Sequence, residues 1–342
     1  MKALVLEEYM KLVYKDFPGP EIDDDEVLIQ VKACGICGSD VHGMDGSTGR
    51  RIPPIVMGHE ASGIIKEVGK NVVHWKAGDR VTFDSTIYPL NDWYTLHGNY
   101  NLSDNRKVLG VSPGEYRKHG AFAEYVSVPE HILYRIPNNV SFEQAAMVEP
   151  VAVALHSISL SGIKLGDTAV VVGVGMIGIF IIKLLKLSGV KVIAVDLDNA
   201  KLKQAQTSGA DMILNADDQD LMEQIRASCN GRGADFAFEA VGITPTVNTA
   251  ISSVRKGGNV VLVGNLSPKI ELPLQKVVTQ ELTVQGSCAI NGEYEKVLQL
   301  MSQGLIRVDD QITAVAPLRE GTAWFGRLYE KEQGLNKIIL TP

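Results

Sequence analysis

Over the first 150 or so residues, apolar and polar positions alternate in short stretches that are separated by loops. Such stretches include Glu26–Val31 (EVLIQV) and Ala61–Val68 (ASGIIKEV), and a Gly78-Asp79 turn leads into residues 80–83 (RVTF). Alternation with a period of two residues predicts strands that bury one face. The chain is therefore expected to begin with a β-rich region.

The pattern changes near Leu165. Residues 168–172 (TAVVV) form a continuous apolar and mostly β-branched run, which is typical of a strand buried on both faces of a parallel sheet. A glycine-rich turn follows, then apolar residues at helical spacing over 177–187, then a second strand over 191–195. This order predicts a βαβ unit. The alternation continues with strand candidates at 212–214, 236–239, 260–263 and 282–286 and with helices at 200–208, 221–229 and 247–254.

Six parallel strands predict a doubly wound α/β domain in the middle of the chain. With 342 residues the chain is long enough for two domains. Residues 336–341 (NKIILT) have the composition of a further strand, and we expect it to need partners outside the parallel sheet. The chain is therefore expected to return to its first domain, so that residues 1–151 and 287–342 form one domain and 152–286 the other.

Composition narrows the choice of partners. Apolar residues make up 45% and charged residues 21%, which is the balance of a soluble globular protein. A formal net charge of -7 argues against nucleic-acid binding, which needs a basic surface. The chain opens without a secretory pattern, and its longest apolar run, 169–182, is too short and too rich in glycine to span a bilayer. We expect a cytoplasmic protein with neither nucleic acid nor membrane as a partner.

The four cysteines do not suggest a disulfide framework, because only Cys34 and Cys37 lie close together in the sequence. In a reducing compartment, a clustered cysteine is more often a metal ligand or a reactive thiol. This directs attention to the first 60 residues.

A GxGxxG run, Gly173-Val174-Gly175-Met176-Ile177-Gly178, connects the first parallel strand to its helix. Gly173 permits a tight turn, Gly175 lets a pyrophosphate approach the backbone, and Gly178 lets the helix pack closely on the strand. The start of the helix offers free N–H groups to phosphates. Asp196 ends the next strand, where its carboxylate can bind the ribose hydroxyls and repel a 2′-phosphate. The motif therefore predicts a site for NAD rather than NADP.

Two residues near this motif have alternative interpretations. Asp196 could merely precede the next helix, and Lys201 is either a ribose contact or a solvated helix residue. The remaining candidate cofactor contacts lie in the motif or near the ends of the fourth and fifth parallel strands: Met176, Ile177, Val241, Val263 and Gly264.

Residues 33–42 (ACGICGSDVH), 58–60 (GHE) and 148–150 (VEP) resemble the signatures of zinc-containing medium-chain alcohol and polyol dehydrogenases. The GxGxxG domain also lies where that family has it, and the similarity extends over nearly the whole chain. The resemblance implies an α/β fold with two domains. A GroES-like β-rich catalytic domain is formed by residues 1–151 and 287–342, and a Rossmann domain, residues 152–286, is inserted between these two segments of the chain.

The resemblance also implies a catalytic zinc ion. Such an ion needs three protein ligands and one open position, and the family pattern assigns two ligands to Cys37 and His59. In the polyol branch a glutamate replaces the second cysteine, and Glu149 matches that position. Glu60 is the rival third ligand and could exchange with Glu149 or with water. Asp40 is expected to hydrogen-bond His59 and to fix its tautomer.

Ser39 and His42 match the family's proton relay. By resemblance, Ser39 would touch the bound alcohol, and the cofactor ribose would link Ser39 to His42, which exchanges protons with solvent. A histidine suits this role because its ordinary pKa lies near physiological pH. The alternatives are a turn serine and a surface histidine.

The sequence departs from the family in the lobe that often binds a second, structural zinc through four cysteines. None of the four aligned positions holds a cysteine, since they are occupied by Pro89, Asp92, Thr95 and Ser103. We therefore expect one zinc ion per chain and none in the lobe. Aromatic residues are available to pack this lobe instead: Trp93, Tyr94 and Tyr100.

Substrate specificity is less clearly encoded. Gly43 stands where sorbitol-type enzymes often carry a tyrosine, and it would leave room for a bulkier alcohol. The neighbouring Arg50 and Arg51 could bind a substrate phosphate or carboxylate, or could form a solvated pair. We expect a secondary alcohol of a polyol or sugar as substrate. The alternatives are an amino alcohol, as in threonine dehydrogenase relatives, and a non-catalytic cofactor-binding protein. The resemblance also implies a homodimer or homotetramer, in which the parallel sheets of two subunits pair through residues 281–286.

Overall fold

The computed structural model describes residues 1–111 and 118–342. Contacts within the chain divide it into two compact units, Met1–Glu149 with Ile290–Pro342 and Pro150–Ala289. The boundaries expected from the sequence followed residues 151 and 286. Among the described residues, no helix has the length and apolar character that crossing a membrane requires.

The second unit contains a six-stranded parallel sheet in the order β13-β12-β11-β14-β15-β16, so the predicted doubly wound sheet is confirmed. The strands are β11 (Thr168–Val172), β12 (Lys191–Asp196), β13 (Met212–Asn215), β14 (Ala234–Glu239), β15 (Val254–Leu262) and β16 (Thr283–Gly286). The helices are α5 (Met176–Leu187), α6 (Asn199–Thr207), α7 (Leu221–Ser228), α8 (Thr244–Ser253) and α9 (Leu274–Thr279). The helix α4 (Val148–Ser161) carries the chain across the boundary between the units.

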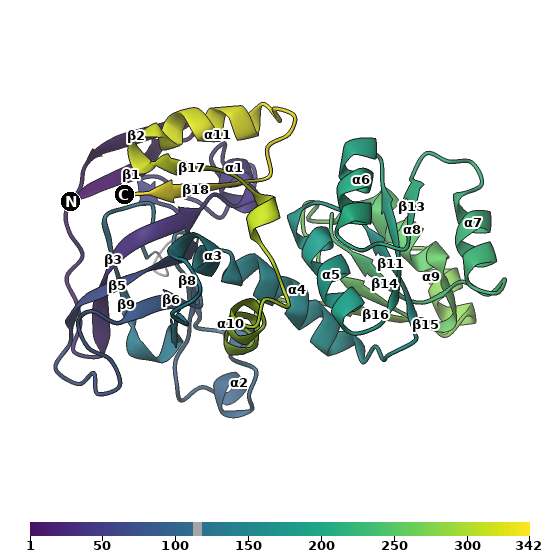
Figure 1. Cartoon of the computed structure of the whole chain (residues 1–342), viewed down its shortest axis with the longest axis horizontal. Helices are drawn as coiled ribbons and strands as arrows, with labels where there is room; N and C mark the ends of the chain where they lie inside the picture. The colour runs from purple at the N-terminus through teal and green to yellow at the C-terminus, as the bar shows by residue number, and fades with distance from the viewer. Residues whose placement is uncertain (112–117) are drawn as a thin grey trace. The chain divides into compact units, whose positions relative to one another are not determined.

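Alternate residues of the central strands point to opposite faces of this sheet. Val170 and Val172 of β11 belong to a buried cluster with Ile251 of α8 and Ile225 of α7. On the other face, α5 packs on β11 and β12 and contacts α6 (Figure 1). Because both faces are covered, β11 and β12 are apolar and buried over residues 169–172 and 192–195, as these unbroken runs in the sequence predict.

The first unit is built mainly from antiparallel strands in three sheets (Figure 1). The largest has seven strands, in the order β10-β6-β5-β3-β18-β17 with β9 also on β3. Its strands are β3 (Glu26–Gly35), β5 (Glu60–Val68), β6 (Arg80–Phe83), β9 (Tyr125–Pro129), β10 (Leu133–Arg135), β17 (Ile312–Pro317) and β18 (Lys337–Thr341). The smaller sheets are formed by β1 (Lys2–Glu8), β2 (Lys11–Asp16) and β4 (Ile55–Val56), and by β7 (Thr86–Ile87) and β8 (Lys107–Val108).

The α-helices that accompany these sheets in the described part of the unit are α1 (Gly38–Gly43), α2 (Trp93–Leu96), α3 (Phe142–Ala146), α10 (Tyr294–Ser302) and α11 (Gly321–Tyr329). The C-terminal strand β18 pairs with β17 and β3, as its position outside the parallel sheet predicted. Residues 337–341 therefore join the sheet to which β3 and β5 belong.

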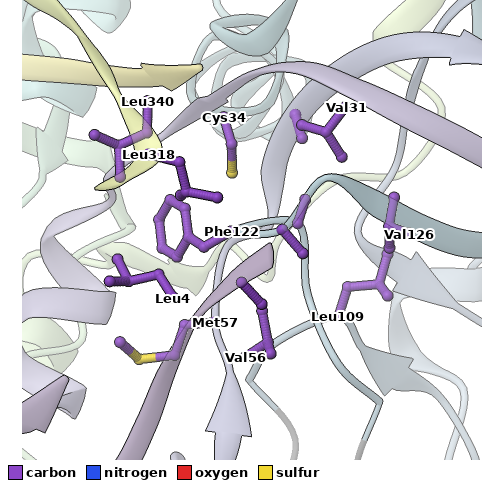
Figure 2. Packing of buried hydrophobic residues seen from close by; sticks show 14 of the residues in the cluster. Leu4, Val31, Cys34, Val56, Met57, Leu109, Phe122, Val126, Leu318 and Leu340 are labelled. Atoms are coloured by element: carbon purple, nitrogen blue, oxygen red, sulfur yellow. The ribbon is translucent and has the colours of Figure 1, made fainter. Parts of the chain in front are cut away.

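The core of the first unit gathers side chains from both ends of the chain around Phe122 (Figure 2). Its ring meets Phe325 edge-on, with ring centroids 5.6 Å apart. Leu4, Leu340 and Cys34 are fully buried in the same cluster. Burying these apolar surfaces is the main stabilising contribution to this unit.

The lobe that aligns with the family's structural-zinc segment is held by hydrogen bonds. The carboxylate of Asp92 accepts hydrogen bonds from the Thr95 backbone N–H, at 2.7 Å, and from the Ser103 hydroxyl. Three of the four aligned positions are thus connected to one another by hydrogen bonds.

Aromatic packing anchors one end of this lobe. Tyr100 stacks on Tyr88 with ring centroids 4.2 Å apart and donates a hydrogen bond to Asp84 at 2.7 Å. Burial raises the pKa of Asp84 to about 6. Trp93, which we also expected to pack the lobe, is 64% exposed and stacks on His97.

Candidate functional site

The antiparallel pairing of β3 with β5 places the two ligand motifs side by side. Gly35, at the end of β3, lies opposite Glu60, at the start of β5. Cys37 follows β3 by two residues, and His59 immediately precedes β5. Residues more than twenty positions apart in the sequence are thereby brought to one end of the same sheet.

Cys37, His59 and Glu60 form the group that could hold a metal ion. Their ligand atoms all lie within 4.8 Å of one another, and among the residues described this is the one such group of three or more. A thiolate, an imidazole and a carboxylate are a donor set that suits zinc. These three residues therefore fit the expected ion.

Cys37 also begins the helix α1. Its Sγ accepts from the Ser39 backbone N–H at 3.4 Å, and its own N–H donates to Asp40 Oδ2 at 3.4 Å. This reciprocal capping fixes the sulfur relative to Ser39 and Asp40.

Asp40 is fully buried and faces His59, with Oδ1 3.4 Å from His59 Nδ1. This contact leaves Nε2 of the imidazole for a metal ion. Burial alone would raise the pKa of Asp40, but His59 and the Arg51 guanidinium outweigh it and lower the pKa to about 2. Likewise, burial opposes charge on His59, yet the Asp40 carboxylate and the Cys37 sulfur raise its pKa.

Glu60 is paired with Lys337, whose Nζ lies 2.5 Å from Glu60 Oε2. Both side chains are buried. Gly35 leaves the space for this pair, since a Cβ there would lie 2.4 Å from Glu60 Oε2. Lys337 was not among the site residues expected from the sequence, although a lysine directly before the apolar run 338–340 was a signal that it needed a buried partner.

Glu149, at the start of α4, lies outside the group of three ligands. Desolvation raises the pKa of its carboxyl, and the nearby Glu60 carboxylate raises it further. The two candidates for the third ligand are thus electrostatic neighbours, and in this structure Glu60 is the one grouped with Cys37 and His59.

Ser39 and His42 lie three residues apart on α1 and both are exposed. The Ser39 hydroxyl is 3.2 Å from Cys37 Sγ, next to the candidate metal ligands. His42 lines a cavity of about 160 Å³ together with Gly38, Tyr329 and Asn336. The helix thus presents one hydroxyl beside the ligand group and one imidazole toward open space.

The two arginines expected to act together are separated. Arg50 is exposed, whereas Arg51 is 1% exposed and donates through Nη2 to Asp40 Oδ1 at 2.8 Å and to Ser39 Oγ at 3.0 Å. The expectation of a solvated pair is therefore wrong for Arg51. The space that Gly43 leaves is also not open to an alcohol, because the Arg51 side chain fills it.

The GxGxxG turn of the second unit has the geometry that its glycines predict. Gly173 has φ +87°, and a Cβ at Gly178 would lie 2.0 Å from the Gly173 carbonyl oxygen. Gly175 precedes α5 and has nothing within 4 Å of its Cβ position, and α5 has no side-chain cap. Met176 and Ile177 begin α5, and because no side chain caps this end, its first N–H groups are available to a phosphate.

The other predicted cofactor residues surround this turn, with one exception. Asp196 accepts from the Val174 N–H at 2.8 Å, and a Cβ at Gly173 would lie 2.3 Å from a Val241 methyl group. Val263 and Gly264 immediately follow β15, with Gly264 against the backbone of residues 241 and 242. Lys201 is exposed on α6.

Models of known protein families match residues in both units of the chain. The family model described as "Alcohol dehydrogenase GroES-like domain" matches residues 23–138, and "Zinc-binding dehydrogenase" matches residues 176–303. The chain is 34% identical to D-arabitol-phosphate dehydrogenase of Enterococcus avium, covering 94% of this chain and 92% of that protein. It is 30% identical to sorbitol dehydrogenase of Bacillus subtilis, and this match covers 100% of this chain and 97% of that protein.

Solved structures agree as well. A protein of Sinorhizobium meliloti 1021 bound to NADP superposes with a TM-score of 0.91 at 30% identity, covering 100% of this chain and 99% of that one. An alcohol dehydrogenase of E. coli CFT073 in complex with NADH superposes with a TM-score of 0.92 at 28% sequence identity. The match covers 100% of this chain and 99% of that one. The expected GroES-like and Rossmann domains are thereby confirmed. The chain belongs to the zinc-dependent medium-chain alcohol dehydrogenases, which act on CH–OH groups with NAD(P).

Proposed function

We propose that the protein reversibly oxidises a secondary alcohol of a polyol or sugar to a ketone, with NAD as hydride acceptor. The observation that carries this proposal is the ligand group itself, in which the carboxylate of Glu60 lies beside Cys37 and His59. A carboxylate makes the metal site harder than a second thiolate would, and hard sites favour oxygen ligands. A substrate with neighbouring hydroxyls can offer two such ligands.

Zinc bound by Cys37, His59 and a carboxylate would lower the pKa of a coordinated hydroxyl group toward neutrality. Ser39, beside the ligand sulfur, would accept the proton that the alcohol loses. His42 is exposed three residues further along α1 and would release a proton to solvent. Asp40 would keep His59 oriented with Nδ1 away from the metal. A similar reaction is named for the polyol dehydrogenases to which the chain is related.

The identity of the alcohol is the first prediction. A panel of polyols, polyol phosphates, threonine and ethanol, followed by NADH absorbance, should give the highest kcat/KM with a polyol or its phosphate. Ethanol turned over far faster than any polyol would overturn the proposal, and a preference for threonine would establish the amino-alcohol alternative. If a phosphate is part of the substrate, the exposed Arg50 can contact it, and Arg50→Ala should then lower kcat/KM only for phosphorylated substrates.

The metal content is the second prediction. We propose one zinc ion per chain, in the catalytic group, because none of the four cysteines lies in the lobe around Asp92. Elemental analysis should find one zinc in the unaltered protein and almost none in Cys37→Ala, with activity abolished. NAD binding should persist in this variant, since the ligand lies outside the GxGxxG unit. Two tightly bound zinc ions would contradict the proposal.

The choice of cofactor is the third prediction. Asp196 would accept hydrogen bonds from the adenosine ribose and repel a 2′-phosphate, so NAD should be preferred over NADP. Loss of charged hydrogen bonds in Asp196→Ala should weaken NAD binding by about 10-fold to 100-fold and narrow the preference, as measured by fluorescence titration. Equal catalytic efficiency with both cofactors in the unaltered protein would refute this role.

A matched variant separates cofactor contact from turn stability. Gly175→Ala meets nothing within 4 Å, so the thermal unfolding midpoint should stay unchanged while NAD binds more weakly. Gly178→Ala would collide with the Gly173 carbonyl and should destabilise the protein instead.

The fourth prediction concerns assembly. The strand β16 lies at the edge of the parallel sheet, and exposed apolar side chains precede it at Leu274 and Val278. An unpaired edge next to apolar surface favours pairing with a second copy. We therefore propose a homodimer or homotetramer. Light scattering at micromolar concentration should give a multiple of the 37.1 kDa chain mass, and a monomer would exclude this assembly.

A further inference from the structure

Arg51 is a large, fully buried side chain that the proposed mechanism leaves unused, and it lies against two residues that the mechanism does use. It is 1% exposed, and Asp40, its ion-pair partner, is 0% exposed. Burying a guanidinium is costly unless it is paired and hydrogen-bonded. The position of Arg51 therefore reflects specific contacts.

The geometry of those contacts is unusual for an arginine that only neutralises a carboxylate. Such a pair commonly uses two nitrogens on two carboxylate oxygens. Here one nitrogen, Nη2, donates to both Asp40 Oδ1 and Ser39 Oγ, while the buried Nε has no hydrogen-bond partner among the residues that the structure describes. The second oxygen of Asp40 accepts from the Cys37 N–H. The guanidinium is thus placed to reach the serine as well as the carboxylate.

The contact with Ser39 has a consequence for proton transfer. A guanidinium can only donate, so the Ser39 oxygen must accept from it, and the single hydroxyl hydrogen must point elsewhere. One lone pair of Ser39 is then occupied and one remains for the alcohol O–H, while the hydroxyl hydrogen is donated to Cys37 Sγ at 3.2 Å until it moves onward. Without Arg51 the hydroxyl could turn among its rotamers and donate to the Asp40 carboxylate instead.

We propose that Arg51 is a positioning residue of the proton relay, which holds Ser39 in the orientation that passes a proton from the bound alcohol toward His42. This inference rests on the proposed function, in which Ser39 is the relay hydroxyl. During the step, the alcohol O–H bond would break as a new O–H bond to Ser39 Oγ forms, and the original Ser39 proton would pass through an intervening hydroxyl group to the imidazole of His42, which releases a proton to solvent. Arg51 would keep its own protons throughout, and bound NAD would accept the hydride.

Gly43 has a defined part in this arrangement. A Cβ on Gly43 would lie 2.3 Å from Arg51 Cδ and 2.9 Å from Nε. The glycine is needed for its lack of a side chain rather than for an unusual backbone angle, because its φ is not in the left-handed region. Gly43→Ala should therefore displace Arg51 while leaving its charge in the protein.

The test is a double-mutant cycle between Arg51→Ala and Ser39→Ala, with kcat and KM measured separately. Arg51→Ala should lower kcat by about 10-fold or more, with little change in KM and with one zinc retained per chain. In the Ser39→Ala background, Arg51→Ala should lower kcat by less than about 2-fold, since its target is already gone. Added guanidinium ion should restore part of the activity of Arg51→Ala and none of that of Ser39→Ala.

Two further variants keep the result interpretable. Gly43→Ala should reproduce the loss in kcat, and should have no added effect in the Arg51→Ala background. Arg80→Ala is the matched control, because its guanidinium donates to the carbonyls of Pro137, Asn138 and Val140 in the same unit. This control should lose stability but keep its turnover per zinc ion.

The outcomes distinguish the inference from the function on which it rests. If Ser39→Ala leaves kcat unchanged with zinc bound, the relay itself is wrong. If Ser39→Ala lowers kcat but the losses from Arg51→Ala and Ser39→Ala multiply, the relay stands and Arg51 does not act through Ser39. Loss of zinc from Arg51→Ala would also overturn the inference, because the arginine would then act on the metal ligands through Asp40.

Discussion

The candidate site depends on the pairing of β3 with β5 and β18. Each of the three strands has one end at the candidate site, and each positions at least one residue of that site. Cys37 follows β3, His59 and Glu60 stand at the start of β5, and Lys337 begins β18. Because this pairing fixes the register of all three strands, a slip of one residue would turn Glu60 and Lys337 to the opposite faces of the sheet.

Charge in this site is balanced in two buried ion pairs. Asp40 is compensated by Arg51, and Glu60 by Lys337. Each carboxylate belongs to or contacts the metal-binding group, and each cation comes from a different part of the chain. The pairing explains how so many acidic and basic groups can be buried together, since an isolated buried charge would be strongly unfavourable. A glycine beside each pair, Gly35 and Gly43, leaves the space for it.

The pair formed by Glu60 and Lys337 also bears on which carboxylate completes a metal site. Glu60 lies within reach of the ligand atoms but shares its charge with a lysine. Burial and then the Glu60 carboxylate raise the pKa of Glu149, while His59 and Lys337 partly oppose this rise, so a second negative charge beside Glu60 has a net cost. A divalent cation would relieve that cost, so the two carboxylates are suited to share or exchange a place beside it.

The sequence by itself determined the parallel sheet, the GxGxxG turn, the family and the positions of Cys37, His59 and Asp196. These follow from local periodicity, from glycines at fixed spacing and from contiguous motifs, all of which are visible in a single stretch of chain. Only the tertiary structure decided that Arg51 points inward, that Gly43 makes room for it, and that Lys337 reaches Glu60. The residues of these contacts lie from 8 to 277 positions apart, and strand register and burial select their partners. Arg50 and Arg51 show the limit most clearly: two adjacent arginines have the same local signal, and only the packing of the fold gives one to solvent and the other to Asp40 and Ser39.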